Sequence, residues 1–261
     1  MTNTFSVPAA TESGFISRSH QAIEPFALHR PSTVIEAASL IDSGAVPHAG
    51  GIDVVSRLRR GAAAAAVVRL DRIDELRRIE VNEDHLVLGA GVTHAQVESD
   101  AEIGSARPDL ATAWKTLGNL RIRRTGTIGG NLMAFDSTYD AAPILAAAEA
   151  RLVFASPDGT VYETSVTDRP ETGLLVRCEI PLAGRVVFDR SLKPVVSVAV
   201  GNDSVAIGCA YDSPIVVARQ GFDQSLLPDP VDDAYATAAY RQRMIEVLIS
   251  RAEQQHGHLE T

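Results

Sequence analysis

Arg123-Arg124-Thr125-Gly126-Thr127-Ile128-Gly129-Gly130-Asn131-Leu132 contains two adjacent glycines between an apolar and a polar residue. A second pair lies upstream, in His48-Ala49-Gly50-Gly51-Ile52-Asp53, where it follows an apolar stretch and has the polar Asp53 close behind. Glycine lets the backbone approach a ligand closely and adopt positive φ. Main-chain N–H groups ahead of a helix bind phosphate groups. The two turns together predict a site in which unpaired amides grip the diphosphate of a dinucleotide from two sides.

The spacing of the glycines excludes two common phosphate-binding motifs. Neither turn fits the GxGxxG pattern of a Rossmann unit or the GxxxxGK[ST] pattern of a P-loop. One glycine pair alone is usually a plain turn, so the prediction depends on there being two.

The residues around the first turn predict a small α/β unit with a parallel sheet. Thr33 and Glu36 fit a capping box, and the helix that they open is expected to run to about Asp42 and to stop at Gly44. A buried strand over 45–49 leads into the turn. A helix over 53–60 and a strand over 64–70 follow.

The rest of the chain predicts a mixed α/β part and then an antiparallel part. We expect a strand over 85–91, helices opening at Thr93 and near Pro108, an irregular basic stretch over 118–124 and a helix over 140–149. A hairpin over 151–164 and a strand over 173–180 complete this part. Four antiparallel strands and a helix are expected after it, over 186–190, 194–200, 204–211, 215–218 and 233–255.

This pattern predicts an N-terminal tail and two domains. The tail covers residues 1–24. The first domain covers 25–181, in two subdomains of about 25–75 and 76–181, and a C-terminal α+β domain covers 182–261.

Composition excludes several classes of function. The chain has 261 residues with 33 acidic and 24 basic side chains, a net charge of -9, which argues against a nucleic-acid binder. No apolar run approaches the roughly 20 residues of a membrane span. The two cysteines, Cys178 and Cys209, are far apart, so they predict neither an iron–sulfur cluster nor a zinc site. We expect both to be buried, in a protein of the reducing cytoplasm.

The stretch over 123–132 resembles the RNxGTIGGNL signature of the FAD-binding medium subunits of molybdenum hydroxylases, the carbon monoxide dehydrogenase and xanthine dehydrogenase type. The segment from His48 to Val54 is similar to the AGGTDL turn of that family. The likeness extends, by order and spacing of shorter segments, from Pro25 to Arg251.

The resemblance implies an α+β fold with a two-part, PCMH-like FAD-binding domain, a small C-terminal antiparallel sheet with a helix, and FAD as the cofactor. It implies that both turns hold the diphosphate, that Asp140 contacts the ribityl–isoalloxazine region and that Leu117 packs the adenine. Leu175 is expected near the flavin ring, with Lys193 or Arg190 as a basic neighbour. The residues assigned to FAD are His48, Ala49, Gly50, Gly51, Ile52, Asp53, Val54, Leu117, Thr127, Ile128, Gly129, Gly130, Asn131, Asp140, Leu175 and Lys193. No catalytic or metal-binding residue is assigned.

Each of these assignments has a structural alternative. Asp140 also fits the N-cap of the helix that follows it. Leu117 and Leu175 also fit a plain apolar core, and Lys193 a solvated surface. His48 and His94 lie beside the two turns, where a lone histidine is usually structural.

The chain also departs from the family pattern. Ile52 stands where threonine is usual, Arg124 where asparagine is common, and the segment 136–140 lacks the proline of the DPAxD pattern. Tyr139 is bulky for its place. The region over 219–230 is shorter than usual.

The leading functional hypothesis, implied by the resemblance, is an electron-transfer subunit. Its partners are a molybdopterin-containing large chain and a small chain with two [2Fe-2S] clusters, and its acceptor is NAD, oxygen or a quinone. The alternative is a stand-alone FAD-dependent oxidase or dehydrogenase of a small organic substrate, which the shortened C-terminal region motivates. A third hypothesis is an interaction protein that has lost FAD.

Overall fold

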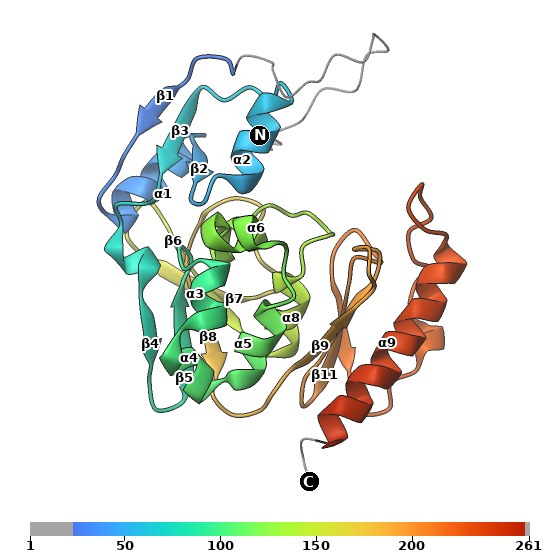
Figure 1. Ribbon diagram of the computed structural model, residues 1–261. Helices are drawn as coiled ribbons and strands as arrows, with labels where there is room; N and C mark the ends of the chain where they lie inside the picture. Colours follow the sequence, from blue (N-terminus) through green and yellow to red (C-terminus); the bar gives the residue numbers. More distant parts are fainter. Residues whose placement is uncertain (1–22, 259–261) are drawn as a thin grey trace.

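The computed structural model describes residues 23–258. Nearly all of the predicted tail over 1–24 therefore lies outside the described residues. Three sheets and the helices packed on them form the described chain (Figure 1). The α+β class predicted from the sequence is confirmed.

The first sheet is parallel, with the strand order β1-β3-β2. The side chain of Thr33 accepts a hydrogen bond from the Glu36 amide, and so begins the first helix as predicted. Gly44, at φ 93°, follows the end of that helix. The elements of this part are β1 (Ala27–His29), α1 (Val34–Asp42), β2 (Val46–His48), α2 (Ile52–Arg59) and β3 (Ala66–Arg69).

The second sheet has five antiparallel strands in the order β4-β5-β8-β6-β7. Helices α3, α4 and α5 lie across β4, β5 and β8 in Figure 1. The largest apolar cluster includes Leu86, Trp114 and Phe154, all fully buried. The strands are β4 (Ile79–Val81), β5 (His85–Gly89), β6 (Arg151–Ala155), β7 (Val161–Ser165) and β8 (Leu174–Pro181). The helices are η2 (Asp74–Arg77), α3 (His94–Ser99), α4 (Ala101–Ala106), α5 (Pro108–Trp114), α6 (Leu120–Thr125), α7 (Ile128–Leu132) and α8 (Ala141–Ala147).

The third sheet is antiparallel, in the order β12-β11-β10-β9. Helix α8 contacts the central strands β10 and β11, and α9 contacts β9 and β10. Ile245, Leu248 and Ile249 of α9 pack on the valines of β10 in a second apolar cluster. The elements are β9 (Val187–Arg190), β10 (Ser197–Val200), β11 (Ser204–Gly208), β12 (Ile215–Ala218), η3 (Gln224–Leu226) and α9 (Ala238–His258).

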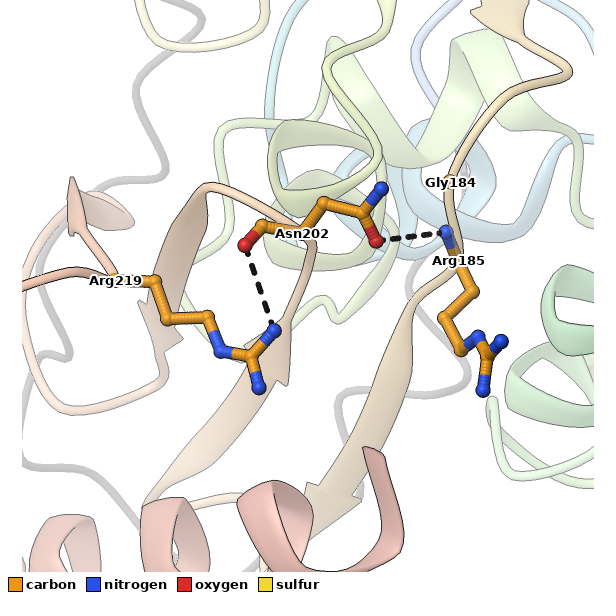
Figure 2. Close-up of a pocket in the computed structure, with 4 residues that line it drawn as sticks. All are labelled: Gly184, Arg185, Asn202 and Arg219. Carbon is orange, nitrogen blue, oxygen red and sulfur yellow. Dashed lines mark hydrogen bonds between the residues drawn. The ribbon is translucent and has the colours of Figure 1, made fainter. Parts of the chain in front are cut away.

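The segment between β8 and β9 is hydrogen-bonded to the turn between β10 and β11 of the third sheet. The Oδ1 atom of Asn202 accepts a hydrogen bond from the Arg185 amide at 3.3 Å. The Nη1 atom of Arg219 donates to the Asn202 carbonyl at 3.4 Å (Figure 2). With Gly184 these residues line a polar hollow of about 330 Å³, and no residue assigned to FAD lines it.

One predicted element is wrong, and six short ones were not predicted. The stretch 118–124 was expected to be irregular, yet α6 begins at Leu120. The side chain of Asn119 caps the helix by accepting from the Ile122 amide at 3.0 Å, and Arg123 pairs with Glu98 of α3 at 2.7 Å. Tertiary pairing of this kind stabilises a six-residue helix whose sequence lacks an apolar period. The elements that were not predicted are the strands β1 and β4 and the short helices η2, α4, α7 and η3.

The predicted domain boundaries remain predictions. Strand β3 ends at Arg69, β8 ends at Pro181 and β9 begins at Val187. Within residues 23–258, no helix is both long and apolar enough to cross a bilayer.

Candidate cofactor-binding site

The first glycine turn joins the end of β2 to the start of α2. Gly51 is the N-cap of α2 and adopts a left-handed conformation, φ 77° and ψ 1°. A Cβ atom at this position would lie 2.7 Å from Nε2 of His48, so both the backbone angle and the space require glycine. Among the described residues, the amides of Gly51, Ile52 and Asp53 have no hydrogen-bond acceptor. They form a helix N-terminus that can bind an anion.

The first turn touches the backbone immediately ahead of the second. A Cβ atom on Gly50 would lie 1.6 Å from the carbonyl oxygen of Thr125 and 3.2 Å from Cα of Gly126. Two segments more than 70 residues apart in the sequence therefore meet at a glycine that has no room for a side chain. The structure brings together the two motifs that the sequence singled out.

The second turn differs from the prediction that its amides are unpaired. It forms the short helix α7, in which the hydroxyl of Thr127 accepts from the Gly130 amide at 3.0 Å. The Ile128 and Gly129 amides donate to the carbonyls of Val92 and Ala90 at 3.0 and 2.8 Å, and the Asn131 amide donates to the Thr127 carbonyl at 2.9 Å. The prediction is wrong for this turn because the segment after β5 supplies acceptors for it.

The glycines of the second turn have separate roles. A Cβ atom on Gly129 would lie 2.8 Å from Cβ of Ala90, so glycine permits close packing there. Gly130 is exposed, and its Cβ atom would meet only the Thr127 hydroxyl, at 3.0 Å. The surface at Gly130 is therefore the part of this turn that a ligand can approach.

Two buried polar atoms beside the turns have no hydrogen-bond partner among the described residues. They are Nδ1 of His48 and Oδ1 of Asn131. Buried polar atoms are normally satisfied, so these two fit contacts to a polar ligand. Together with the free amides of the first turn, they fit a group that carries phosphates and hydroxyls, as FAD does.

Arg57 connects the two turns and was not identified from the sequence. Its Nε atom pairs with Asp53 one helical turn earlier, at 2.8 Å. Its Nη2 atom donates to the carbonyl of Ala134, just after α7, at 2.8 Å. Asp53, assigned to the cofactor, therefore has a structural partner, and the i,i+4 spacing of Asp53 and Arg57 was the available signal.

Tyr139 lies half-buried in the loop that follows α7. Burial raises the pKa of its phenol, and the carboxylates of Asp53 and Asp136 raise it further. The influence of Asp53 places Tyr139 near α2. The phenol is therefore protonated at neutral pH and can donate a hydrogen bond at this edge of the site.

Asp140 is buried between α8 and the third sheet, and both of its oxygens have partners. Oδ2 pairs with Nη1 of Arg190 at 2.5 Å, and Oδ1 accepts from the Cys209 thiol at 3.4 Å. Burial raises the pKa of the carboxyl, and Arg190 opposes that rise. Asp140 is the N-cap residue of α8, as the structural alternative predicted, but its side chain makes no capping bond to that helix.

The remaining assigned residues lie in two environments. Leu117 and Leu175 are buried in the main apolar cluster, in agreement with the core alternative. Lys193 is exposed on the loop between β9 and β10, where the Val196 amide donates to the Ser191 hydroxyl at 3.1 Å. Their contact with FAD stays a prediction.

His94 is part of the packing beneath the second turn. Its Nδ1 atom accepts a hydrogen bond from the Trp114 indole at 3.1 Å, and a Cβ atom on Gly126 would lie 3.0 Å from its ring. Burial, and then the charge of Arg123, lower the pKa of His94 to about 4. The structural reading of this histidine is therefore favoured.

This depressed pKa predicts an acid-sensitive fold. The unfolded histidine titrates near 6.5, so its contribution to stability is fully present above that pH and is lost as the pH falls toward 4. We expect this contribution to the unfolding free energy to fall by about 3 kcal/mol between pH 7 and pH 4. Urea unfolding at both pH values measures it. His94→Gln, which cannot titrate, should show a correspondingly smaller fall, and an equal fall in both proteins would contradict the assignment.

Comparison with known proteins identifies the class to which this fold and site belong. Residues 24–169, more than half of the chain and including both glycine turns, match the family described as the FAD binding domain in molybdopterin dehydrogenase. The chain belongs to this family.

Two relatives and one solved structure are similar to the chain. A nicotinate dehydrogenase FAD-subunit of Eubacterium barkeri is 31% identical over 143 residues, 53% of this chain and 48% of the relative. The carbon monoxide dehydrogenase medium chain of Hydrogenophaga pseudoflava is 29% identical over 168 residues, 60% and 58% of the two chains. The chain thus matches about half the length of these relatives. A chain of quinoline 2-oxidoreductase from Pseudomonas putida 86 has the same fold, with a TM-score of 0.81, 21% identity and 91% and 99% coverage.

The predicted family and its FAD cofactor are therefore confirmed. No group of His, Cys, Asp and Glu side chains in the described part of the chain could hold a metal ion. Cys178 and Cys209 are both free and buried.

Proposed function

We propose that this chain is the FAD-binding, electron-transfer subunit of a molybdenum hydroxylase. Its partners are a molybdopterin-containing large chain and a small chain with [2Fe-2S] clusters, and its acceptor is NAD, oxygen or a quinone. The names of the relatives, an FAD-subunit and a medium chain, support an assembly of several chains. Two free, buried cysteines suit a cytoplasmic location.

The geometry of the first turn carries the proposal. The free amides at the start of α2 lie beside the Thr125–Gly126 backbone that leads into the second turn. A helix N-terminus with unpaired amides favours a diphosphate. We therefore assign the diphosphate to Gly51, Ile52 and Asp53, with His48 and Asn131 as side-chain contacts.

Bound FAD supplies one- and two-electron redox chemistry, which belongs to the cofactor. The residues of this chain bind it, orient it and limit the access of water. Arg57 fixes the separation of α2 and the end of α7, and the Asp140–Arg190 pair fixes α8 to the third sheet. No side chain of the site is required to act as an acid or a base.

Native purification tests the proposal. We expect the full chain to be yellow, to release FAD on denaturation, and to co-purify with chains that carry molybdenum and iron. An absorption spectrum and metal analysis of the same sample measure all three. A chain that cannot be loaded with FAD would defeat the proposal. A yellow chain that oxidises a small organic substrate without partners would instead establish the stand-alone enzyme.

A further inference from the structure

Phe135 combines three features that bear on the cofactor-binding site. It is a large aromatic residue with 42% of its surface exposed. Its backbone is left-handed, with φ 50°. It lies in the loop between α7, which contains the second glycine turn, and α8. A bulky residue at positive φ is strained, and such strain tends to persist at functional positions.

Arg169 holds the ring in place from one side. Its guanidinium carbon lies 4.6 Å from the centroid of the Phe135 ring. The same guanidinium donates to the carbonyls of Leu132 and Val166 at 3.0 and 2.6 Å. These hydrogen bonds restrict the motion of the arginine. The Phe135 ring therefore makes its cation–π contact with a guanidinium group that is held in place.

Ala134, the residue before Phe135, is connected to the helix that follows the first turn. The carbonyl of Ala134 accepts from Arg57 of α2 at 2.8 Å. Arg57 and Arg169 therefore bind the end of α7 through different carbonyls, and Phe135 follows directly after it. Phe135 thus lies just after the second glycine turn, next to a residue that Arg57 connects to the helix of the first turn.

We propose that Phe135 stacks against a planar ring of the bound FAD. The inference rests on the proposed function and extends it by adding a residue to the site. One face of the ring contacts Arg169, and a flat aromatic ligand complements a rigid aromatic ring. The energetic advantage of that contact explains why a strained, exposed phenylalanine occupies this loop.

Phe135→Asn separates this role from a structural one. Asparagine is among the few residues that accept a left-handed backbone, so the FAD-free variant should melt at or above the wild-type temperature. Its affinity for FAD should fall by about 10-fold or more. Phe135→Tyr should bind like the wild type. Tyr235→Asn, which removes an exposed aromatic residue of the C-terminal region, is the matched control and should bind FAD normally.

The measurements are flavin fluorescence titration and melting of the full chain, with ADP as a second ligand. Weaker binding of FAD and ADP together assigns the contact to the adenine, and weaker binding of FAD alone assigns it to the isoalloxazine. Unchanged FAD affinity and an unchanged flavin spectrum in Phe135→Asn would overturn the inference while leaving the proposed function intact. Wild-type protein that binds no FAD would instead defeat the proposed function.

Discussion

Gly50→Ala is expected to abolish FAD binding by the full chain. The new Cβ atom would lie 1.6 Å from the Thr125 carbonyl oxygen and 2.6 Å from its carbonyl carbon. Both atoms belong to the backbone, so no side-chain rotation relieves the overlap, and the first turn must move away from the segment before α7. Overpacking of this kind costs roughly 3 kcal/mol or more, which corresponds to at least about a 100-fold loss of affinity.

A titration of the FAD-free protein with FAD, together with its melting temperature, measures this effect. Gly104→Ala is the control, because a Cβ atom on Gly104 of α4 would meet nothing within 4 Å. Alanine in a helix should stabilise the chain there by about 0.5–1 kcal/mol. If Gly50→Ala bound FAD within twofold of the wild type, the two turns would not form one site.

The parts of the fold that were predicted correctly depend on residues close together in the sequence. The capping bond of Thr33 to Glu36, the left-handed Gly44 and the hairpin over 151–164 each form within a few residues. Gly51 belongs to this group, since its turn is built by the residues on either side of it. Such caps and turns can be predicted from a single sequence because the interacting residues are close together in the chain.

The second glycine turn shows why a short stretch of sequence does not predict all of its own contacts. Its amides resemble those of the first turn in sequence, but they bond to Ala90 and Val92, which lie more than 30 residues earlier. Nothing in the residues 127–131 reveals that a strand end will cover them. The same glycine pattern therefore gives a free helix terminus at one turn and a packed one at the other.

Pairings between side chains that are distant in the sequence could likewise not be predicted. Arg57 was not singled out, although it connects α2 to Ala134. Asp140 was assigned to FAD or to a helix cap, and the structure pairs it with Arg190, 50 residues later. A pairing at that separation requires the third sheet to be placed against α8, which no local pattern determines.

Arg190→Ala is expected to destabilise the chain by about 3–5 kcal/mol at neutral pH, because it leaves the Asp140 carboxylate buried without its ion partner. Asp140 has 3% of its surface exposed. Loss of the partner should loosen the third sheet from α8 and thereby disturb the segment between Asn131 and Asp140. Urea unfolding of wild type and variant measures the loss. Arg177→Ala, which breaks the more exposed pair with Glu179, should cost less than about 1 kcal/mol.

The pH dependence distinguishes this mechanism from a simple loss of packing. Burial raises the pKa of Asp140 above its ordinary value, so the carboxyl favours folding most below the unfolded pKa, near 3.9, and this contribution is lost as the pH rises through the folded pKa. Removal of Arg190 takes away the strongest opposing influence and raises the folded pKa further. The difference between variant and wild type should therefore be small at pH 4 and should grow toward pH 8. Asp140→Asn in the Arg190→Ala background should restore most of the stability lost at pH 8, since the buried group is then uncharged. A loss of the same size at both pH values, or no recovery in the double variant, would show that Arg190 contributes through packing rather than through its charge.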